Sequence, residues 1–187
     1  VYPGFHGEAV NGYIVRPLGE QALPGMIVIH EAGGLGAHVR DVCDRIAQLG
    51  FLALGVDLYT REGGPPPTDD LEAMMARLFS MPDERVLGDL VGAADHLRAR
   101  ADAGGPVGCI GFCMGGRYTL LLATSSDRLQ AAVDCWGGFI DKATFDEPLQ
   151  YSEGIPFVLV NGIAVVRNGE LVDGVAPGRA ARAPISP

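Results

Sequence analysis

Short apolar runs alternate with segments of helical periodicity over about the first 140 residues, and this alternation constrains the fold more than any other feature. The runs "GMIVIHE", "FLALGVDLY" and "GPVGCIGF" are typical of strands buried on both faces. Between them, "AHVRDVCDRIAQLG" has apolar residues at helical spacing and ends on a glycine, and Asp83 is expected to cap a later helix. Strands that alternate with helices of this length require right-handed crossovers. We therefore expect a parallel sheet with helices on both faces.

The pattern changes beyond about residue 140. The segment "IPFVLVNGIAVVRNGELVDG" contains three strand-like runs separated by Asn-Gly pairs at 161–162 and 168–169, and this pair is the strongest short-range hairpin signal. The final stretch, "VAPGRAARAPISP", is expected to be poorly ordered. The sequence thus predicts an α/β core over residues 1–140 and a β-hairpin tail over residues 141–187 that completes or extends the sheet.

Charge and hydropathy exclude several classes of partner. The formal net charge of −9 and the lack of a basic stripe argue against nucleic acid, because phosphate binding needs clustered Lys and Arg. The apolar runs are too short to cross a bilayer, and the first residues, "VYPGFHGEAVNG", do not resemble a signal peptide. We expect a cytoplasmic protein that acts on a small molecule and has neither nucleic acid nor membrane as a partner.

The chain has four cysteines, and their placement indicates reduced thiols rather than a disulfide framework. Cys109 and Cys135 lie in strand-like runs, and Cys43 lies in a helical pattern. No second Cys or His pair follows Cys109 and Cys113 at the spacing of a metal site, so no metal or other cofactor is expected.

The stretch "GFCMGG", residues 111 to 116, stands between a predicted strand and a predicted helix. It fits a nucleophile elbow, a turn so tight that a Cβ on its glycines would clash. The elbow would lift Cys113 onto the helix N-terminus, which favours a thiolate, and would aim the Met114 N–H at a developing oxyanion. The same segment could also be a glycine-rich turn in which Cys113 is only a small buried residue. The flanking strand and helix favour the elbow, whereas Cys109 is expected in the core.

Three separated motifs, "PGMIVIHEAGGLGAHVRDVCDRIAQLGFLALGVDLYTREG", "GCIGFCMGGRYTLLLA" and "AAVDCWGG", resemble the dienelactone hydrolase family, the carboxymethylenebutenolidases. The resemblance covers roughly residues 7–140. It implies a three-layer α/β-hydrolase-like fold, a parallel sheet flanked by helices, here truncated and extended by the C-terminal β-hairpin. It also implies a hydrolase that opens lactones or esters through a cysteine nucleophile and needs no metal.

The same resemblance assigns roles to individual residues. Cys113 matches the nucleophile, and Glu31 in "HEAGG" matches the glutamate that contacts the resting thiol and helps to activate it. Ala32 matches the second oxyanion donor, beside Met114, through its backbone N–H. Glu31 also fits an ordinary loop carboxylate at the start of a helix, where the helix dipole favours it.

The histidine and the acid of a catalytic triad are not found. In this fold both follow the nucleophile along the chain. All four histidines precede Cys113: His6, His30, His38 and His96. His30 is the closest substitute, but strand alternation should point its side chain away from Glu31, and the other three are expected to be exposed or structural. Three aspartates near the expected place of the acid fit solvated loops better: Asp141, Asp146 and Asp173.

The tail has a resemblance of its own. Over roughly residues 141–182, and mainly through the motif "VNGxxVVxxGE", it is similar to the C-terminal end of amidohydrolases of the N-acyl-D-amino-acid deacylase type. In those enzymes the segment belongs to a small β-domain beside a metal-bearing barrel. The metal ligands lie in the barrel, so the resemblance implies no amidohydrolase activity here.

The leading hypothesis is a dienelactone hydrolase-like enzyme that attacks a lactone or ester through Cys113 and is impaired because the triad is incomplete. The alternative is a non-catalytic small-molecule-binding or interaction protein on a truncated hydrolase scaffold. A redox-sensing thiol at Cys113 is a third hypothesis. The resemblance to dienelactone hydrolases implies arginines that bind a substrate carboxylate, and Arg77 and Arg85 are the candidates for this role. An uncovered sheet edge further predicts a homodimer.

Overall fold

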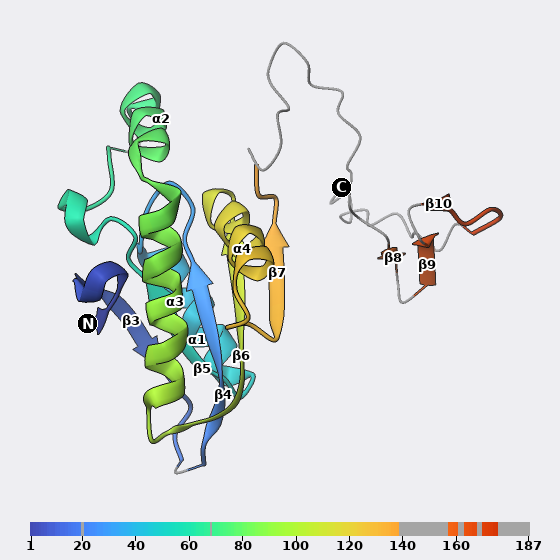
Figure 1. Ribbon diagram of the computed structural model, residues 1–187, viewed down its shortest axis with the longest axis horizontal. Coiled ribbons are helices and arrows are strands. Elements are labelled where there is room, and N and C mark those ends of the chain that lie inside the picture. Colours follow the sequence, from blue (N-terminus) through green and yellow to red (C-terminus); the bar gives the residue numbers. More distant parts are fainter. Residues whose placement is uncertain (20, 68, 139–156, 161–162, 168–169, 176–187) are drawn as a thin grey trace, which may run out of the picture. The chain divides into compact units, whose positions relative to one another are not determined.

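The computed structural model describes residues 1–19, 21–67, 69–138, 157–160, 163–167 and 170–175. The chain forms two compact units, Val1–Lys142 and Ala143–Pro187, which are described separately (Figure 1). The predicted division of the chain between residues 140 and 141 stays a prediction.

The first unit is built on a five-stranded sheet with the order β3-β5-β4-β6-β7. Its strands are β3 (Gly12–Val15), β4 (Leu23–Ile29), β5 (Leu52–Val56), β6 (Ala103–Phe112) and β7 (Ala131–Cys135). Strands β5, β4, β6 and β7 are parallel, as the apolar runs predict. The edge strand β3 pairs antiparallel with β5. The C-terminal ends of β4 and β6 therefore meet at one edge of the sheet, where ligands of open α/β sheets bind.

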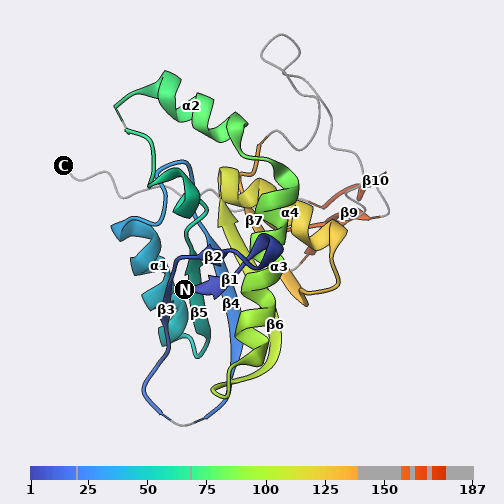
Figure 2. The same cartoon turned by 60° about the vertical axis from the view of Figure 1, so that its left-hand side comes forward.

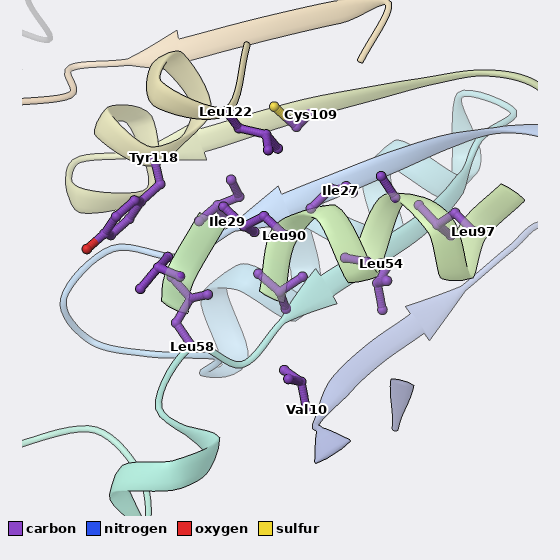
Figure 3. Close-up of a cluster of buried hydrophobic side chains, with 14 of the residues drawn as sticks. Val10, Ile27, Ile29, Leu54, Leu58, Leu90, Leu97, Cys109, Tyr118 and Leu122 are labelled. Atoms are coloured by element: carbon purple, nitrogen blue, oxygen red, sulfur yellow. The ribbon is translucent and has the colours of Figure 1, made fainter. Parts of the chain in front are cut away.

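Helices cover both faces of this sheet. They are α1 (Ala37–Gln48), α3 (Asp83–Ala99) and α4 (Met114–Ser125), while α2 (Leu71–Ser80) belongs to the connection between β5 and α3. Figures 1 and 2 show α1 on one face and α3 with α4 on the other. Side chains of β4 alternate between the faces: Ile27 and Ile29 pack in the cluster under α3 and α4, and Val28 packs under α1. Figure 3 shows the larger cluster, and the three-layer α/β prediction is confirmed.

A small N-terminal element was not predicted from the sequence. Strands β1 (Tyr2–Pro3) and β2 (Ala9–Val10) pair antiparallel around the 3-10 turn η1 (Phe5–Gly7). The buried carboxylate of Asp89, in the middle of α3, accepts the N–H of Phe5 at 2.9 Å. Strands of two residues are too short to show the alternation of apolar and polar residues that identifies a strand in a sequence. They are recognised only from their contacts in the folded structure.

The prediction that Asp83 caps a helix is wrong. Pro82 is the N-cap of α3, and Asp83 is its first helical residue with no capping bond from its side chain. The carboxylate instead forms two hydrogen bonds with the guanidinium of Arg117 in α4, at 2.8 and 2.7 Å. The pair links the first turns of α3 and α4.

The second unit contains a three-stranded antiparallel sheet with the order β10-β9-β8. Its strands are β8 (Phe157–Val160), β9 (Ile163–Arg167) and β10 (Glu170–Leu171). The strand pairings confirm the two predicted hairpins, although the Asn-Gly turns at 161–162 and 168–169 and the end of the tail lie outside the described residues. That the tail also completes or extends the larger sheet stays a prediction.

Candidate functional site

The elbow is present and its backbone is strained. Cys113 stands between β6 and α4 with φ 51° and ψ −114°, in the left-handed half of conformational space that a residue with a Cβ rarely adopts. Its N–H donates to the carbonyl of Cys135 at the end of β7 (2.9 Å), and its carbonyl accepts the N–H of Arg117 (3.1 Å). Strain of this kind costs about 1–3 kcal/mol and persists where the surrounding structure enforces it, typically at functional sites.

Two glycines make the tight turn geometrically feasible. A Cβ on Gly111 would collide with the backbone carbonyl of Gly115 and lie 2.5 Å from Thr119 Oγ1. A Cβ on Gly115 would lie 2.7 Å from the carbonyl oxygen of His30 and closer still to that of Ile29. The helix can start directly over the end of β4 only because these positions have no side chain.

The four thiols are free, and Cys113 alone among them is exposed. Cys43 and Cys109 are buried, and burial raises the pKa of their thiols to about 12 and about 11. Burial also raises the pKa of the half-buried Cys135. The prediction of Cys109 as a core residue is confirmed, and the geometry leaves Cys113 as the accessible thiol.

Cys113 lies where two cavities meet. One cavity, of about 500 Å³, also contains Met114, the first residue of α4. The other, of about 490 Å³, contains Glu31 and Ala32 from the loop that follows β4. Cys113 and Trp136 line both cavities. The structure thus brings together all four residues that the sequence singled out, from segments more than 80 residues apart.

Tyr59, which the sequence analysis did not single out, links the two loops of the site. Its hydroxyl donates to the carbonyl oxygen of Ala32 at 3.1 Å and lies 3.8 Å from the sulfur of Met114. The side chain is buried, and burial raises its pKa to about 12, so the hydroxyl keeps its proton at neutral pH. Tyr59 therefore connects the backbone of the loop after β4 with the side chain of the first residue of α4.

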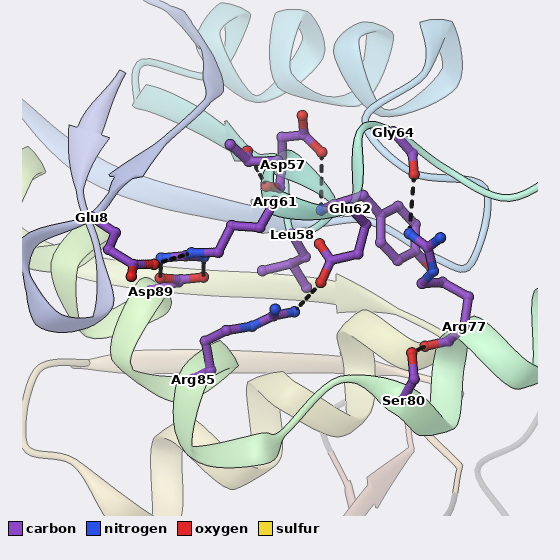
Figure 4. Close-up of polar contacts among 12 residues, drawn as sticks. Glu8, Asp57, Leu58, Arg61, Glu62, Gly64, Arg77, Ser80, Arg85 and Asp89 are labelled. Atoms are coloured by element: carbon purple, nitrogen blue, oxygen red, sulfur yellow. Dashed lines mark hydrogen bonds and ion pairs between the residues drawn. The ribbon is translucent and has the colours of Figure 1, made fainter.

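The segment that carries Tyr59 is itself fixed by ion pairs (Figure 4). In the following 3-10 turn, η2 (Thr60–Glu62), Arg61 makes two hydrogen bonds to Asp89 at 2.6 and 2.9 Å. Glu62 in the same turn pairs with Arg85 of α3 at 2.5 Å. A tyrosine on a segment anchored in this way is held in place before any ligand binds.

The two arginines proposed to bind a substrate carboxylate are placed elsewhere. Arg85 is paired with Glu62, and Arg77 lies over the ring of Tyr59 at 5.9 Å with one N–H 3.4 Å from the carbonyl of Gly64. Neither lines the two cavities that meet at Cys113.

Glu31 has an oxygen available for chemistry. Its Oε2 is buried and, within the described part of the chain, has no hydrogen-bond partner. A buried carboxylate oxygen without a partner is costly in a folded protein, so this atom calls for an explanation such as a catalytic role or a bound water. Here the oxygen belongs to a residue in the wall of the same cavity as the Cys113 thiol.

His30 is a structural residue. Its ring is fully buried, Nδ1 donates to the carbonyl oxygen of Glu31 at 2.6 Å, and Nε2 accepts the N–H of Leu58 at 3.1 Å. Both nitrogens are committed to the backbone, and burial lowers the pKa of the ring. His30 is therefore not available as a general base.

Stability should fall in mildly acidic solution because of this histidine. The pKa of His30 is lowered in the folded protein, so below its ordinary value of about 6.5 the unfolded chain binds a proton that the folded chain does not. We expect the free energy of unfolding to drop by up to about 1.4 kcal/mol from pH 7.5 to 5.5, the full drop applying when the folded protein takes up no proton at His30 in this range. The lowered pKa values of Asp83 and Asp102 act only at more acidic pH.

Urea unfolding at the two pH values measures this drop. The pKa of His96 is also lowered, mainly by burial, so His96→Gln is the matched control and should keep most of the effect. Equal stability at both pH values would show that His30 becomes protonated in the fold.

Sequence reasoning missed the place of His38. This exposed residue in the first turn of α1 lines the cavity of Glu31 and Cys113, with its ring centroid 6.4 Å from that of Phe112. In the described residues no carboxylate hydrogen-bonds to the ring, as a triad acid would. The only sequence signal was its position shortly after the Glu31 loop.

The other triad candidates lie elsewhere. His96 stacks on Tyr2 with ring centroids 5.8 Å apart, and His6 is exposed beside Phe5, so both are away from the cysteine. Asp173 is an exposed residue of the second unit. Asp141 and Asp146 lie outside the described residues.

Metal sites and membrane-spanning helices would indicate other classes of function. In the part of the chain that the structure describes, no three His, Cys, Asp or Glu side chains gather as metal ligands. No helix there has the length and apolar character that crossing a bilayer requires. The cytoplasmic location and the homodimer stay predictions.

Comparison with known proteins places the chain in a family. The model of the dienelactone hydrolase family matches residues 10–158. A carboxymethylenebutenolidase-like protein of Escherichia coli (strain K12) is 37% identical over 150 residues, covering 77% of this chain and 54% of the relative. One from Salmonella typhi is 36% identical over 148 residues, covering 76% and 53%. The chain thus spans about half the length of the curated relatives it matches.

A solved structure agrees with the sequence relatives. The crystal structure of a dienelactone hydrolase-like protein from Klebsiella pneumoniae superposes with a TM-score of 0.69 at 34% identity, over 79% of this chain and 62% of that one. The match extends the predicted resemblance past residue 140, while the tail's similarity to amidohydrolases stays a prediction. With a family model that covers most of its length and a cysteine elbow at the end of strand β6, the chain belongs to the dienelactone hydrolase family.

Proposed function

We propose that the chain is a hydrolase of esters or lactones in which Cys113 is the nucleophile and the second half of the reaction is slow. The observation that carries this proposal is the strained, exposed Cys113 at the junction of two cavities. Family membership supports hydrolysis. Of the four thiols, the one on the elbow is the one that solvent and a substrate can reach.

In the first half-reaction Glu31 takes the proton of the thiol, and the sulfur attacks the carbonyl carbon. As the C–S bond forms, the carbonyl electron pair moves onto oxygen, where the N–H groups of Met114 and Ala32 stabilise it. The N–H of Met114 is available because the first residues of a helix have no intrahelical acceptor. When the carbonyl re-forms, the bond to the alcohol oxygen breaks, and the alcohol leaves with the proton that Glu31 holds.

The second half-reaction needs a base to activate water against the thioester. His30 is committed to the backbone, and no histidine follows Cys113 in the 187 residues. General-base catalysis contributes about 100- to 10,000-fold to such a step. We therefore infer that the acyl-enzyme accumulates.

A burst experiment with p-nitrophenyl acetate tests the proposal. We expect one equivalent of p-nitrophenolate per chain, followed by release slower by about 100-fold or more. Added imidazole should raise the slow rate in proportion to its concentration, because it supplies the missing base.

His38→Gln is the control, and it should leave both phases unchanged. A fast second phase that this substitution abolishes would make His38 the base and overturn the impairment. If ester is turned over steadily without a burst, the slow second half-reaction is contradicted, and if neither a burst nor steady release occurs at any ester concentration, the non-catalytic binding hypothesis replaces the hydrolase.

A further inference from the structure

The larger cavity at Cys113 has a mostly apolar wall. Leu78 and Met81, at and just after the end of α2, face Met114 and Tyr118 of α4, and Trp136 after β7 completes the wall. Met81, Met114 and Tyr118 are buried, whereas Trp136 is 74% exposed. The volume of about 500 Å³ lies within the range of about 300–1,000 Å³ that is usual for small-molecule sites.

The two charged residues in this wall balance each other. Asp83 and Arg117 share two hydrogen bonds at 2.8 and 2.7 Å, and the hydroxyl of Tyr118 donates to the same carboxylate at 3.3 Å. The guanidinium holds the pKa of Asp83 below its ordinary value, so both groups are charged at neutral pH. The described part of the wall therefore carries one positive and one negative charge at hydrogen-bond distance, and these two groups together offer an anion no net attraction.

We propose that this cavity binds the apolar, uncharged part of the substrate, so that the chain prefers esters with an alkyl or arylalkyl acyl chain over esters that carry a carboxylate there. The inference rests on the proposed function, because Cys113 in the cavity wall is what places an ester carbonyl at its mouth. Apolar contacts with the wall replace water around the chain, whereas a carboxylate would be desolvated beside Asp83.

A length-matched set of p-nitrophenyl esters tests the preference through the rate constant of the burst. The hexanoate should acylate Cys113 about tenfold or more faster than the acetate, because its extra methylenes fill the cavity. The mono-p-nitrophenyl ester of hexanedioic acid has the same length but ends in a carboxylate. It should react about tenfold more slowly than the hexanoate.

Asp83→Asn sharpens the test, since it removes the negative member of the pair and keeps Arg117. We expect the hexanedioate ester to gain about tenfold relative to the hexanoate in this variant. Asp95→Asn is the matched control, because it makes the same charge change at a pair with Arg128, 3.1 Å apart, that lines neither cavity at Cys113. Equal rates for hexanoate and hexanedioate esters in all three proteins would overturn the proposal.

Binding without chemistry separates this inference from the nucleophile. Trp136 is the only tryptophan, so its fluorescence reports on the cavity. Hexanamide, which does not acylate thiols, should change the emission saturably and bind at least tenfold more tightly than the monoamide of hexanedioic acid. Saturable hexanamide binding without an ester burst would contradict the role of Cys113 as the nucleophile, while the proposal that the cavity binds an apolar chain would stand. A burst whose rate does not depend on the length or the charge of the acyl chain would contradict only the proposed preference of the cavity for apolar chains.

Discussion

Cys113→Ala abolishes the burst of p-nitrophenolate, with a fall of at least about 1,000-fold in the acylation rate constant. The expectation follows from the role of the sulfur as the atom that forms the covalent bond, for which the remaining oxyanion donors cannot substitute. Stopped-flow absorbance on the wild type and the variant measures it. Cys135→Ala, which removes the neighbouring half-buried thiol, should keep the full burst amplitude.

Cys113→Gly separates a nucleophile from a structural thiol. Because the residue has φ 51° and ψ −114°, glycine relieves strain there, and we expect the free energy of unfolding to stay level or rise by up to about 1–2 kcal/mol while the burst is lost. A buried structural cysteine would give the opposite result, a less stable protein. A burst of normal amplitude in either Cys113 variant would contradict the assignment.

Gly115→Ala lowers both the stability and the acylation rate. The added Cβ would lie 2.7 Å from the carbonyl oxygen of His30 and nearer to that of Ile29, and both are backbone atoms that cannot rotate away. Helix α4 must then move off the end of β4, at a cost of about 3 kcal/mol in unfolding free energy. The displacement also carries the N–H of Met114 away from the oxyanion position, so the burst should slow by at least tenfold.

Gly138→Ala is the matched control for this substitution. No described residue lies within 4 Å of a Cβ at Gly138, so the stability of this variant should stay within about 0.5 kcal/mol of the wild type. Urea unfolding and the burst assay on both variants provide the comparison. If Gly115→Ala is as stable and as active as Gly138→Ala, the elbow does not depend on close contact with β4.

The elbow could be predicted from sequence because its determinants are local. Gly111, Cys113 and Gly115 lie within five consecutive residues, and each glycine is required by a close approach that the strand-turn-helix pattern already implies. The order of apolar runs likewise predicts the parallel sheet, since crossover connections leave few arrangements.

What sequence reasoning missed depends on contacts between distant segments. Tyr59 ends a strand-like run, and nothing in the residues around it predicts its contact with Ala32 and Met114. These residues come together only when the sheet folds. The pairing of Asp83 with Arg117 overrode the capping preference of an aspartate at a helix start, because a bidentate partner on α4 was within reach. His38 could not be assigned to the cavity until the direction of α1 was known.

Mass spectrometry of the quenched reaction tests the central claim most directly. The protein is mixed with excess p-nitrophenyl acetate, quenched in acid at intervals during the slow phase, and analysed intact and as peptides. We predict that most chains carry one acetyl group, that it lies on Cys113, and that it persists while p-nitrophenolate release is slow. Unmodified protein during continued release, or an acetyl group on another residue, would contradict the account.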